Sequence, residues 1–311
     1  MSKKPKKQDK NVDSNGIKSK RRRKRSSKTL INPEIILSSE FETGNGKDFK
    51  EYDTDIYGFY PERDPGELYS GQPFYFKFSV KNRLLRPTDI KKITVTAIAD
   101  YDKIWKGWTS SLNIKLWKYL PNGIIQHLNP RRVKPTRQSI GINLKVSPQE
   151  SYKISNLLVI PYSDMKDMLL NYHGANPNTT ELTKIGVSAL ENEIYSLRIL
   201  PKNQSQNYAE KPLILVSGTP QSNEFGDYAA LNILSLYLDE GPKYWENLAE
   251  SFRLEFIFFQ NPDGIVEGKN MVNSEGENIF FGFKKHAEEC PKECKKIWEH
   301  IEKDPPQLYL E

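Results

Sequence analysis

Residues 213–230 read LILVSGTPQSNEFGDYAA, and residues 253–264 read RLEFIFFQNPDG. In each stretch a short apolar run, of the kind found in buried strands, ends in a turn that contains Pro, Gly and Asn. The first turn leads into a segment whose apolar residues recur at helical spacing up to Leu238. Strands that alternate with helices predict an α/β layer with a partly parallel sheet. Because ligands of such sheets bind beyond the carboxyl ends of the strands, both turns are candidate parts of a functional site.

The same alternation runs through residues 160–311 and defines a second folded domain. It predicts these further elements: a helix over 164–172 with Ser163 as its N-cap, a strand over 193–199, a long helix over 284–302 and the start of a strand over 307–310. The sequence stops where this last strand would finish. We therefore expect a truncated sheet with an uncovered edge and apolar face, which would invite a protein partner.

Residues 32–159 predict a β-sandwich domain in front of this layer. Four runs within it alternate apolar and polar residues, which is the period of a strand: 74–80, 93–98, 112–116 and 142–146. Gly, Pro and Asn separate these runs, so we expect antiparallel strands across about 55–160, after an irregular stretch over 32–70. We expect the tryptophans of this region, Trp105, Trp108 and Trp117, to pack in its core or rim rather than to form a sugar-binding face.

Residues 1–31 predict a disordered basic tail. Of the 46 Lys and Arg, 13 lie in residues 1–28, which contain only two acidic residues, so the net charge of +6 belongs to this tail. Almost no apolar residue is present there to drive folding. The run KRRRKR at 20–25 fits contact with a polyanion, and it fits a solubilising tail equally well. No aromatic residue is interleaved to stack on bases, so nucleic-acid binding is not the main function that we expect.

Length and composition narrow the class of protein. The 311 residues suit two domains, and a hydrophobic content of 37% supports a folded body. No apolar run approaches the roughly 18 residues of a membrane span. The first residues carry charge without the apolar stretch of a secretory signal, and two cysteines make no disulfide framework. We therefore expect a cytoplasmic protein with no membrane span.

His286, Cys290 and Cys294 recur every four residues in the helix expected over 284–302. Three ligands on one straight helix cannot surround a tetrahedral ion, so we expect two cytosolic thiols here rather than a metal site. We expect His300 to lie on the solvated face of the same helix. No Walker loop, Gly-x-Gly-x-x-Gly or Gly-x-Ser-x-Gly motif is present in the sequence.

The two stretches quoted at the outset resemble the zinc carboxypeptidases of the M14 type, and in particular their cytosolic-carboxypeptidase-like members. That family has an apolar strand, a Gly and a His-x-x-Glu motif before a helix of small residues, and the matching register here is Gly218 and then Gln221-Ser-Asn-Glu224. The family's next strand ends in Asn-Pro-Asp-Gly, as at 261–264, and Ile185-Gly-Val-Ser188 is similar to its opening strand pair. The resemblance covers about 160–311, close to half of a full family domain. It implies an incomplete M14-like mixed sheet with helices, behind the β-sandwich that precedes some intracellular members.

The resemblance also implies a zinc site that this chain does not complete. The family binds zinc through His, Glu and a second His, which would lie beyond residue 311. Glu224 stands at the glutamate position and Gln221 at that of the first histidine, so both are vestigial zinc positions. The family's arginines for substrate have no counterpart, because Met271 stands at one position and Phe280 with Phe281 at the Asn-Arg pair.

We therefore expect a zinc metallocarboxypeptidase-like protein that does not bind zinc and is catalytically inactive. Two alternatives stay open. The chain is a non-enzymatic binding or scaffold module that uses the β-sandwich and the basic tail, or it is one half of a split peptidase whose partner completes the sheet and the zinc site.

Overall fold

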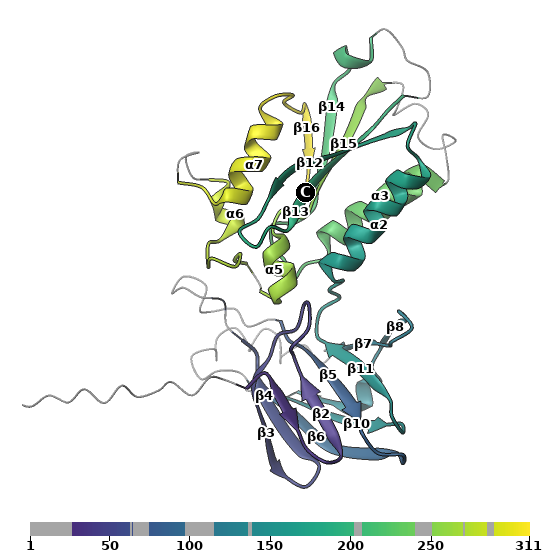
Figure 1. Ribbon diagram of the computed structural model, residues 1–311, viewed down its shortest axis with the longest axis vertical. Coiled ribbons are helices and arrows are strands. Elements are labelled where there is room, and N and C mark those ends of the chain that lie inside the picture. Colours follow the sequence, from purple (N-terminus) through teal and green to yellow (C-terminus); the bar gives the residue numbers. More distant parts are fainter. Residues whose placement is uncertain are drawn as a thin grey trace, which may run out of the picture.

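The computed structural model describes residues 27–62, 64, 75–96, 115–135, 139–201, 207–239, 251–269, 271–284 and 289–311. Two bodies are stacked end to end, an all-β part below and an α/β layer above (Figure 1). The disordered tail that we expect over residues 1–31 is wrong for its last three residues, because Thr29–Ile31 form strand β1. Residues 1–26 lie outside the described residues. No helix in the described part of the chain is long and apolar enough to cross a membrane.

The all-β part consists of two sheets. The six-stranded sheet has the order β1 (Thr29–Ile31), β2 (Ile35–Ser38), β5 (Lys77–Asn82), β11 (Ser151–Ser155), β7 (Trp117–Tyr119) and β8 (Ile125–His127). The five-stranded sheet has the order β3 (Lys47–Asp53), β4 (Ile56–Tyr60), β6 (Thr88–Thr96), β10 (Ser139–Val146) and β9 (Val133–Pro135). All pairs are antiparallel except β4 with β6, which is parallel and departs from our expectation.

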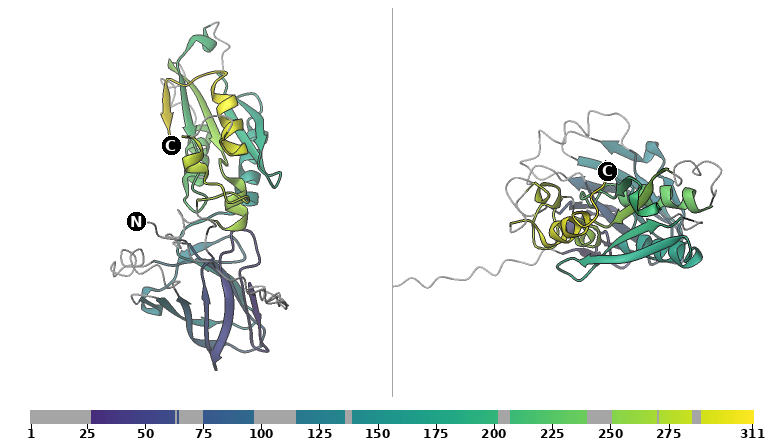
Figure 2. Two further views of the ribbon diagram at one scale, coloured as in Figure 1. Left: turned by 90° about the vertical axis from the view of Figure 1, so that its left-hand side faces the viewer. Right: turned by 90° about the horizontal axis from the view of Figure 1, so that it is seen from above.

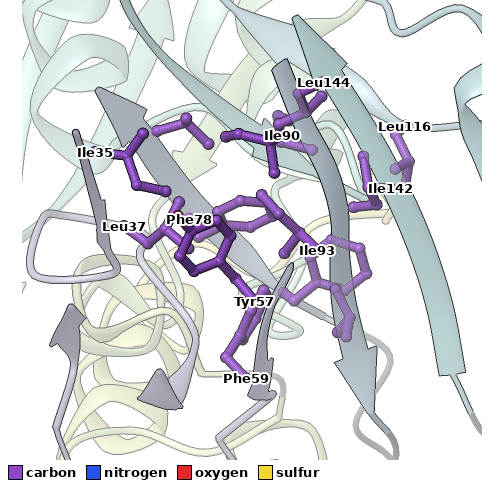
Figure 3. Close-up of a cluster of buried hydrophobic side chains, with 14 of the residues drawn as sticks. Ile35, Leu37, Tyr57, Phe59, Phe78, Ile90, Ile93, Leu116, Ile142 and Leu144 are labelled. Atoms are coloured by element: carbon purple, nitrogen blue, oxygen red, sulfur yellow. The ribbon is translucent and has the colours of Figure 1, made fainter. Parts of the chain in front are cut away.

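One apolar core lies between these two sheets (Figure 3). In β10, Ile140, Ile142, Leu144 and Val146 are buried at alternate positions, as the period of the sequence predicts. Phe59 and Phe78 meet there with their ring centroids 4.9 Å apart. Trp117 is partly buried and its ring centroid lies 4.0 Å from that of His127, whereas Trp105 and Trp108 lie outside the described residues.

We expect residues 32–70 to be irregular, and this prediction is wrong over much of their length. The segment contains strands β2, β3 and β4. Strand β3 is at the edge of its sheet and buries a single side chain, that of Phe49. A strand with one buried residue among polar neighbours has no apolar alternation, so its period is invisible in the sequence.

The α/β layer has a five-stranded sheet with the order β12 (Thr180–Val187), β13 (Glu193–Ile199), β15 (Arg253–Phe258), β14 (Leu213–Ser217) and β16 (Leu308–Leu310). The first three strands are antiparallel, and β15, β14 and β16 are parallel. Strand β16 confirms the strand expected over 307–310. The mixed sheet arises because the chain enters through a hairpin and continues through helical crossovers.

Helices cover both faces of this sheet (Figures 1 and 2). Helices α2 (Tyr162–Ala175) and α3 (Gly226–Asp239) share a buried cluster with Phe256 and Phe258. On the opposite face Ile297 of α7 (Lys292–Ile301) packs with Leu215 and Ile257. The even- and odd-numbered residues of the strands therefore face different helices, as the period of two requires.

Two helix boundaries differ from our predictions. Helix α2 has Pro161 at its N-cap, and Ser163 instead donates from its N–H and its hydroxyl to the Glu42 carboxylate, at 2.9 and 2.5 Å. The long helix over 284–302 is wrong, because the structure has a short α6 (Ile279–Gly282) and then α7, which begins only after Pro291. Pro291 explains the late start, since its ring disfavours the helical conformation of the residue before it.

The loop before β3 joins the all-β part to helix α5 (Pro262–Glu267). The N–H of Thr43 donates to the carbonyl oxygen of Val266 at 3.0 Å, and the Asn45 side chain donates to that of Gly268 at 2.8 Å. Gly268 ends α5 in a left-handed conformation (φ 64°), and a Cβ there would lie 2.4 Å from the Gly44 carbonyl oxygen. The two bodies therefore meet backbone to backbone.

Replacing Gly268 by alanine is expected to destabilise the protein more than replacing Gly123, which also has a positive φ (82°) but has open space around its Cβ position. The left-handed backbone costs each alanine about 1 kcal/mol, and the clash with Gly44 should add about 1–3 kcal/mol to Gly268→Ala alone. Thermal and urea unfolding of the two variants measure the difference. Equal losses would mean that the contact between the two bodies is not tight.

Candidate functional site at the ends of two parallel strands

Strands β14 and β15 run parallel, so their carboxyl ends meet at one edge of the sheet. The turn 218–225 follows β14 and leads into α3, and Phe259 to Asn261 follow β15 and lead into α5. Both turns that the sequence singles out thus lie side by side. This edge is where ligands of α/β sheets bind.

A buried carboxyl group joins the two turns. Asp227, in the first turn of α3, accepts the N–H of Phe259 through Oδ1 at 2.8 Å. Burial raises the pKa of Asp227 to about 7, and the N–H of Phe259 opposes that rise. The carboxyl group packs directly against Gly218, where a Cβ would lie only 1.8 Å from Asp227 Oδ1. Glycine at 218 is therefore required for α3 to start so close to the end of β14.

Phe259 has a positive φ of 63°, which is costly for a large side chain. Its ring is fully buried and lies edge-on to that of Tyr162, with the centroids 4.9 Å apart. The packing of the ring and the hydrogen bond to Asp227 hold the strained backbone. The end of β15 is consequently a rigid part of the site.

Asn261 also connects the two turns. Its Nδ2 donates to the carbonyl oxygens of Pro220 and Val272 at 3.3 and 3.2 Å, and its Oδ1 accepts the N–H of Gly264 at 3.0 Å. Asn261 is thus the N-cap of α5. Asn-Pro-Asp-Gly opens a helix here and does not form the isolated type I turn for which its residues are suited.

Asp263 is fully buried and holds the hairpin between β12 and β13 against α5. Its carboxylate accepts four donors: the Ser188 hydroxyl, the Leu190 N–H at 3.0 Å, the Asn192 side chain at 2.8 Å and the Ser274 hydroxyl at 2.6 Å. Such a complete set of donors offsets the cost of burying the charge. In this chain the motif residues Asn261 and Asp263 therefore serve the architecture of the site.

Gln221 and Glu224 lie together at the rim of a cleft of about 1020 Å³. The cleft runs between α3 and the strands β14 and β16, and Glu311 also lines it. Burial raises the pKa of Glu224, and burial together with the nearby Glu224 raises the pKa of Glu311. The other side chains along the cleft are mainly apolar, and the lining contains no Lys, Arg or His among the described residues: Ile214, Val216, Ser217, Thr219, Phe225, Gly226, Ala229, Ala230, Ile233, Tyr237, Leu254, Phe280, Leu308 and Leu310.

The residues present do not fit a catalytic zinc site. Such sites use three His, Glu, Asp or Cys ligands, and Gln221 offers a carboxamide. In the described part of the chain no three His, Cys, Asp or Glu side chains are grouped so as to hold a metal ion. The chemistry of the cleft rim is that of one amide and two carboxylates.

The other expected substrate positions also lie near this edge. The N–H of Met271 donates to Asp64 Oδ2 at 2.7 Å, which ties the segment after α5 to the all-β part. Phe280 lines the cleft, whereas Phe281 is 40% exposed. The structure thus brings Gln221, Glu224 and Phe280 to one cleft, with Met271 outside its lining.

We expect His300 on a solvated helix face from the sequence, and this prediction is wrong. Nε2 of His300 lies 2.5 Å from Oε1 of Glu255, whose side chain is 3% exposed. Burial alone would raise the pKa of Glu255, but hydrogen bonds from His300, Ser196 and Arg198 outweigh it and lower the pKa to about 2. The sequence holds a signal for this group, since Glu255 is a charged residue inside the apolar strand RLEFIF.

The cysteines do not share one helix, because α7 starts at Lys292, after Cys290. Cys294 is buried and its thiol donates to the carbonyl oxygen of Ile279 at 3.4 Å, and burial raises the pKa of that thiol. His286 lies outside the described residues. The shared helix face that we expect for these residues is therefore wrong for Cys290 and Cys294.

Comparison with known proteins gives a family match over part of the chain and a similar fold. Residues 165–288 match the family model of the zinc carboxypeptidases, Peptidase M14. A search of curated protein sequences found no match. The family match spans both turns of the site, from α2 through α6.

Similar solved structures include a putative carboxypeptidase A from Shewanella denitrificans OS-217, with 13% identity, a TM-score of 0.72 and coverage of 88% of this chain and 67% of that chain. A metallo-carboxypeptidase from Burkholderia cenocepacia has 12% identity, a TM-score of 0.70 and coverage of 88% and 69%. A metallo-carboxypeptidase from Pseudomonas aeruginosa, in complex with (2-guanidinoethylmercapto)succinic acid, has 13% identity, a TM-score of 0.71 and coverage of 88% and 68%. This chain therefore has a carboxypeptidase-like mixed α/β fold.

Asp263→Ala is expected to destabilise the protein by about 3 kcal/mol, because it leaves the four donors around the buried carboxylate without their acceptor. Asp167→Ala, at an exposed position of α2, is the control and should change little. Urea unfolding measures both. A loss for Asp263→Ala no larger than that of the control would show that the motif carboxylate does not hold the hairpin.

The lowered pKa of Glu255 predicts that the free energy of unfolding falls at acidic pH. Its pKa is about 2 in the folded protein and about 4.3 when unfolded, so the ionised group stabilises the fold above about pH 4.3. As pH falls toward 2 this contribution, about 3 kcal/mol, is lost. Glu255→Gln should therefore flatten the fall in unfolding free energy between about pH 5 and pH 2, whereas Glu302→Gln, at an exposed position, should not. Parallel curves for Glu255→Gln and the unsubstituted protein would contradict the assignment.

Proposed function

We propose that this zinc carboxypeptidase-like chain, whose residues 165–288 match the M14 family, is a binding protein without peptidase activity of its own. The observation that carries the proposal is the donor set beyond β14, where Gln221 and Glu224 stand at the positions of the family's His-x-x-Glu motif. Zinc in a peptidase polarises the scissile carbonyl and lowers the pKa of its bound water. The carboxamide of Gln221 is a poor ligand for such an ion at a position where the family has an imidazole.

The lining of the cleft supports the same proposal. A peptidase stabilises the developing oxyanion with donors or a cation, and a carboxypeptidase must also bind the terminal carboxylate of its substrate. The sequence has no Arg between residues 254 and 311, and the cleft carries Glu224 and Glu311 where a cation would be needed. Two carboxylates repel an anionic substrate end, so the cleft favours a different ligand.

The size and polarity of the cleft favour binding. Its volume of about 1020 Å³ and its aliphatic and aromatic walls are typical of sites that bury most of a ligand. The rigid turns around Asp227 and Asn261 support one side of it. We place the protein in the cytoplasm, because Cys290 and Cys294 form no disulfide.

Zinc titration by calorimetry tests the proposal. The full chain should show no stoichiometric zinc binding that depends on Glu224, so Glu224→Ala and the unsubstituted chain should give the same isotherm. Gln221→His restores an imidazole and should bind zinc more tightly than the unsubstituted chain, which checks that residue 221 is the ligand position. Tight binding of one zinc ion that is lost in Glu224→Ala would refute the proposal, and peptidase activity would then be measured.

A further inference from the structure

We propose that the cavity between the outer face of the six-stranded sheet and the first turn of α2 binds a small carboxylate with an apolar or aromatic body, whose charge lies beside Lys77 and Lys153. The cavity has a volume of about 360 Å³, which is within the range of sites for small ligands. The residues that line it differ from those of the cleft beside α3. The inference therefore goes beyond the proposed function and is independent of it.

Two lysines reach this cavity because they lie on the same face of the sheet. Lys77 of β5 precedes Phe78, whose side chain is in the core between the two sheets. Lys153 of β11 precedes Ile154, which belongs to the same core, and Lys153 is opposite Tyr119 of β7. Because side chains alternate along a strand, both lysines and Tyr119 point to the outer face of the sheet.

Lys77 and Tyr119 hold the linker between the two bodies against this face. Nζ of Lys77 donates to the carbonyl oxygen of Val159 at 2.8 Å. The hydroxyl of Tyr119 donates to the carbonyl oxygen of Leu157 at 3.0 Å and accepts the N–H of Val159 at 2.9 Å. The linker leads directly into α2, whose first turn contains Asp164 (Figure 1). The cavity therefore has one wall from the sheet and one from the linker and α2, and both are fixed by hydrogen bonds.

The amine of Lys77 has no counter-ion among the described residues. Lys77 is 1% exposed, and its Nζ contacts the linker carbonyl oxygen and the ring of Tyr119, whose centroid is 4.1 Å away. Burial, and after it the nearby Lys153, lowers the pKa of Lys77 to about 7. Asp164 and Glu42 oppose this shift by attraction. A carbonyl oxygen and a ring face stabilise a cation only in part, so protonated Lys77 favours an anion in the cavity.

Lys153 brings a second positive charge to the lining, and Asp164 brings one negative charge. Nζ of Lys153 lies 4.6 Å from the centroid of the Phe41 ring, which is again not a counter-ion. Asp164 is exposed and acts on Lys77 through space. With both lysines protonated the lining carries two positive charges and one negative charge, a net charge of +1. A single carboxylate balances that charge.

The other residues of the lining favour an apolar or aromatic body for the ligand. Tyr119 and Tyr152 come from the sheet, and Leu120, Ile125 and Ile160 lie around them. Such walls pack against a flat or aliphatic group and gain little from a small inorganic anion. A carboxylate on an apolar body therefore suits both the charge and the walls of the cavity.

Matched pairs of ligands test the inference. Phenylpropionate, indoleacetate and hexanoate are titrated into the full chain and followed by NMR of the ligand, each beside its own amide. The amide keeps the body and loses the charge. We expect the carboxylates to bind about tenfold more tightly than their amides at about pH 6, which corresponds to a rise of about one unit in the pKa of Lys77 on binding.

The same change in Lys77 predicts a dependence of binding on pH. Affinity for the carboxylates should fall about tenfold between about pH 6 and pH 9, because Lys77 loses its proton over this range while the ligand stays ionised. Lys77→Met removes the amine and should abolish both the pH dependence and the preference for carboxylates. Lys81→Met, at an exposed position of the same strand, should retain both.

Asp164→Asn tests the charge of the lining at an exposed position, where the substitution does not disturb the buried part of the cavity. Removing this negative charge should tighten carboxylate binding severalfold. Asp167→Asn, which is also exposed on α2, should change the affinity less. Circular dichroism verifies that each variant is folded, and if Lys77→Met is not, Asp164→Asn decides the test.

Three results would overturn the inference. The first is equal binding, or no binding, of the carboxylates and their amides. The second is a preference or a pH dependence that persists in folded Lys77→Met. The third is an affinity for carboxylates that is unchanged or lower in Asp164→Asn. None of these measurements involves zinc or the cleft beside α3, so their outcome leaves the proposed function unaffected.

Discussion

The carboxyl ends of β14 and β15 are buried, and the α/β layer depends on hydrogen bonds that satisfy the polar groups there. Asp227 accepts a hydrogen bond from the N–H of Phe259, and Asn261 donates to Pro220 and Val272. Asp263 accepts four hydrogen bonds, three from the β12–β13 hairpin and one from Ser274. An unsatisfied buried polar group costs about 1–3 kcal/mol, so the loss of any of these hydrogen bonds destabilises the layer. They fix where α3 and α5 begin, and with them the position of the cleft.

The same arrangement separates architecture from chemistry. The residues that keep the turns in place are bonded to the protein itself, whereas Gln221 and Glu224 lie at the cleft rim where a ligand has access. The carboxypeptidase-like fold therefore depends on Asn261 and Asp263 and does not require a histidine at 221. The described part of the site is a mainly apolar cleft with Gln221, Glu224 and Glu311 in its lining.

Local patterns predicted the parts of the fold in which neighbouring residues decide the structure. The alternation in β10, the apolar runs of β14 and β15 and the strand at 307–310 are examples. The errors arise where distant partners decide. His300 is read as solvated because Glu255, its partner, lies 45 residues away, and polar β3 forms only because β4 pairs with it. Gln221 and Glu224 were found from a motif, but the contribution of Glu311 required the parallel pairing of β16 with β14.

The order of the strands along the chain has a consequence for how the protein folds as it leaves the ribosome. Every described strand of the all-β part lies between Thr29 and Ser155, so its two sheets complete their pairing early in synthesis. The partners of Thr43 and Asn45, at Val266 and Gly268, are made more than 100 residues later, which takes about 5–20 s at ordinary rates of translation. The all-β part is thus synthesised before α5, and the contact between Gly44 and Gly268 forms late in the folding of the chain.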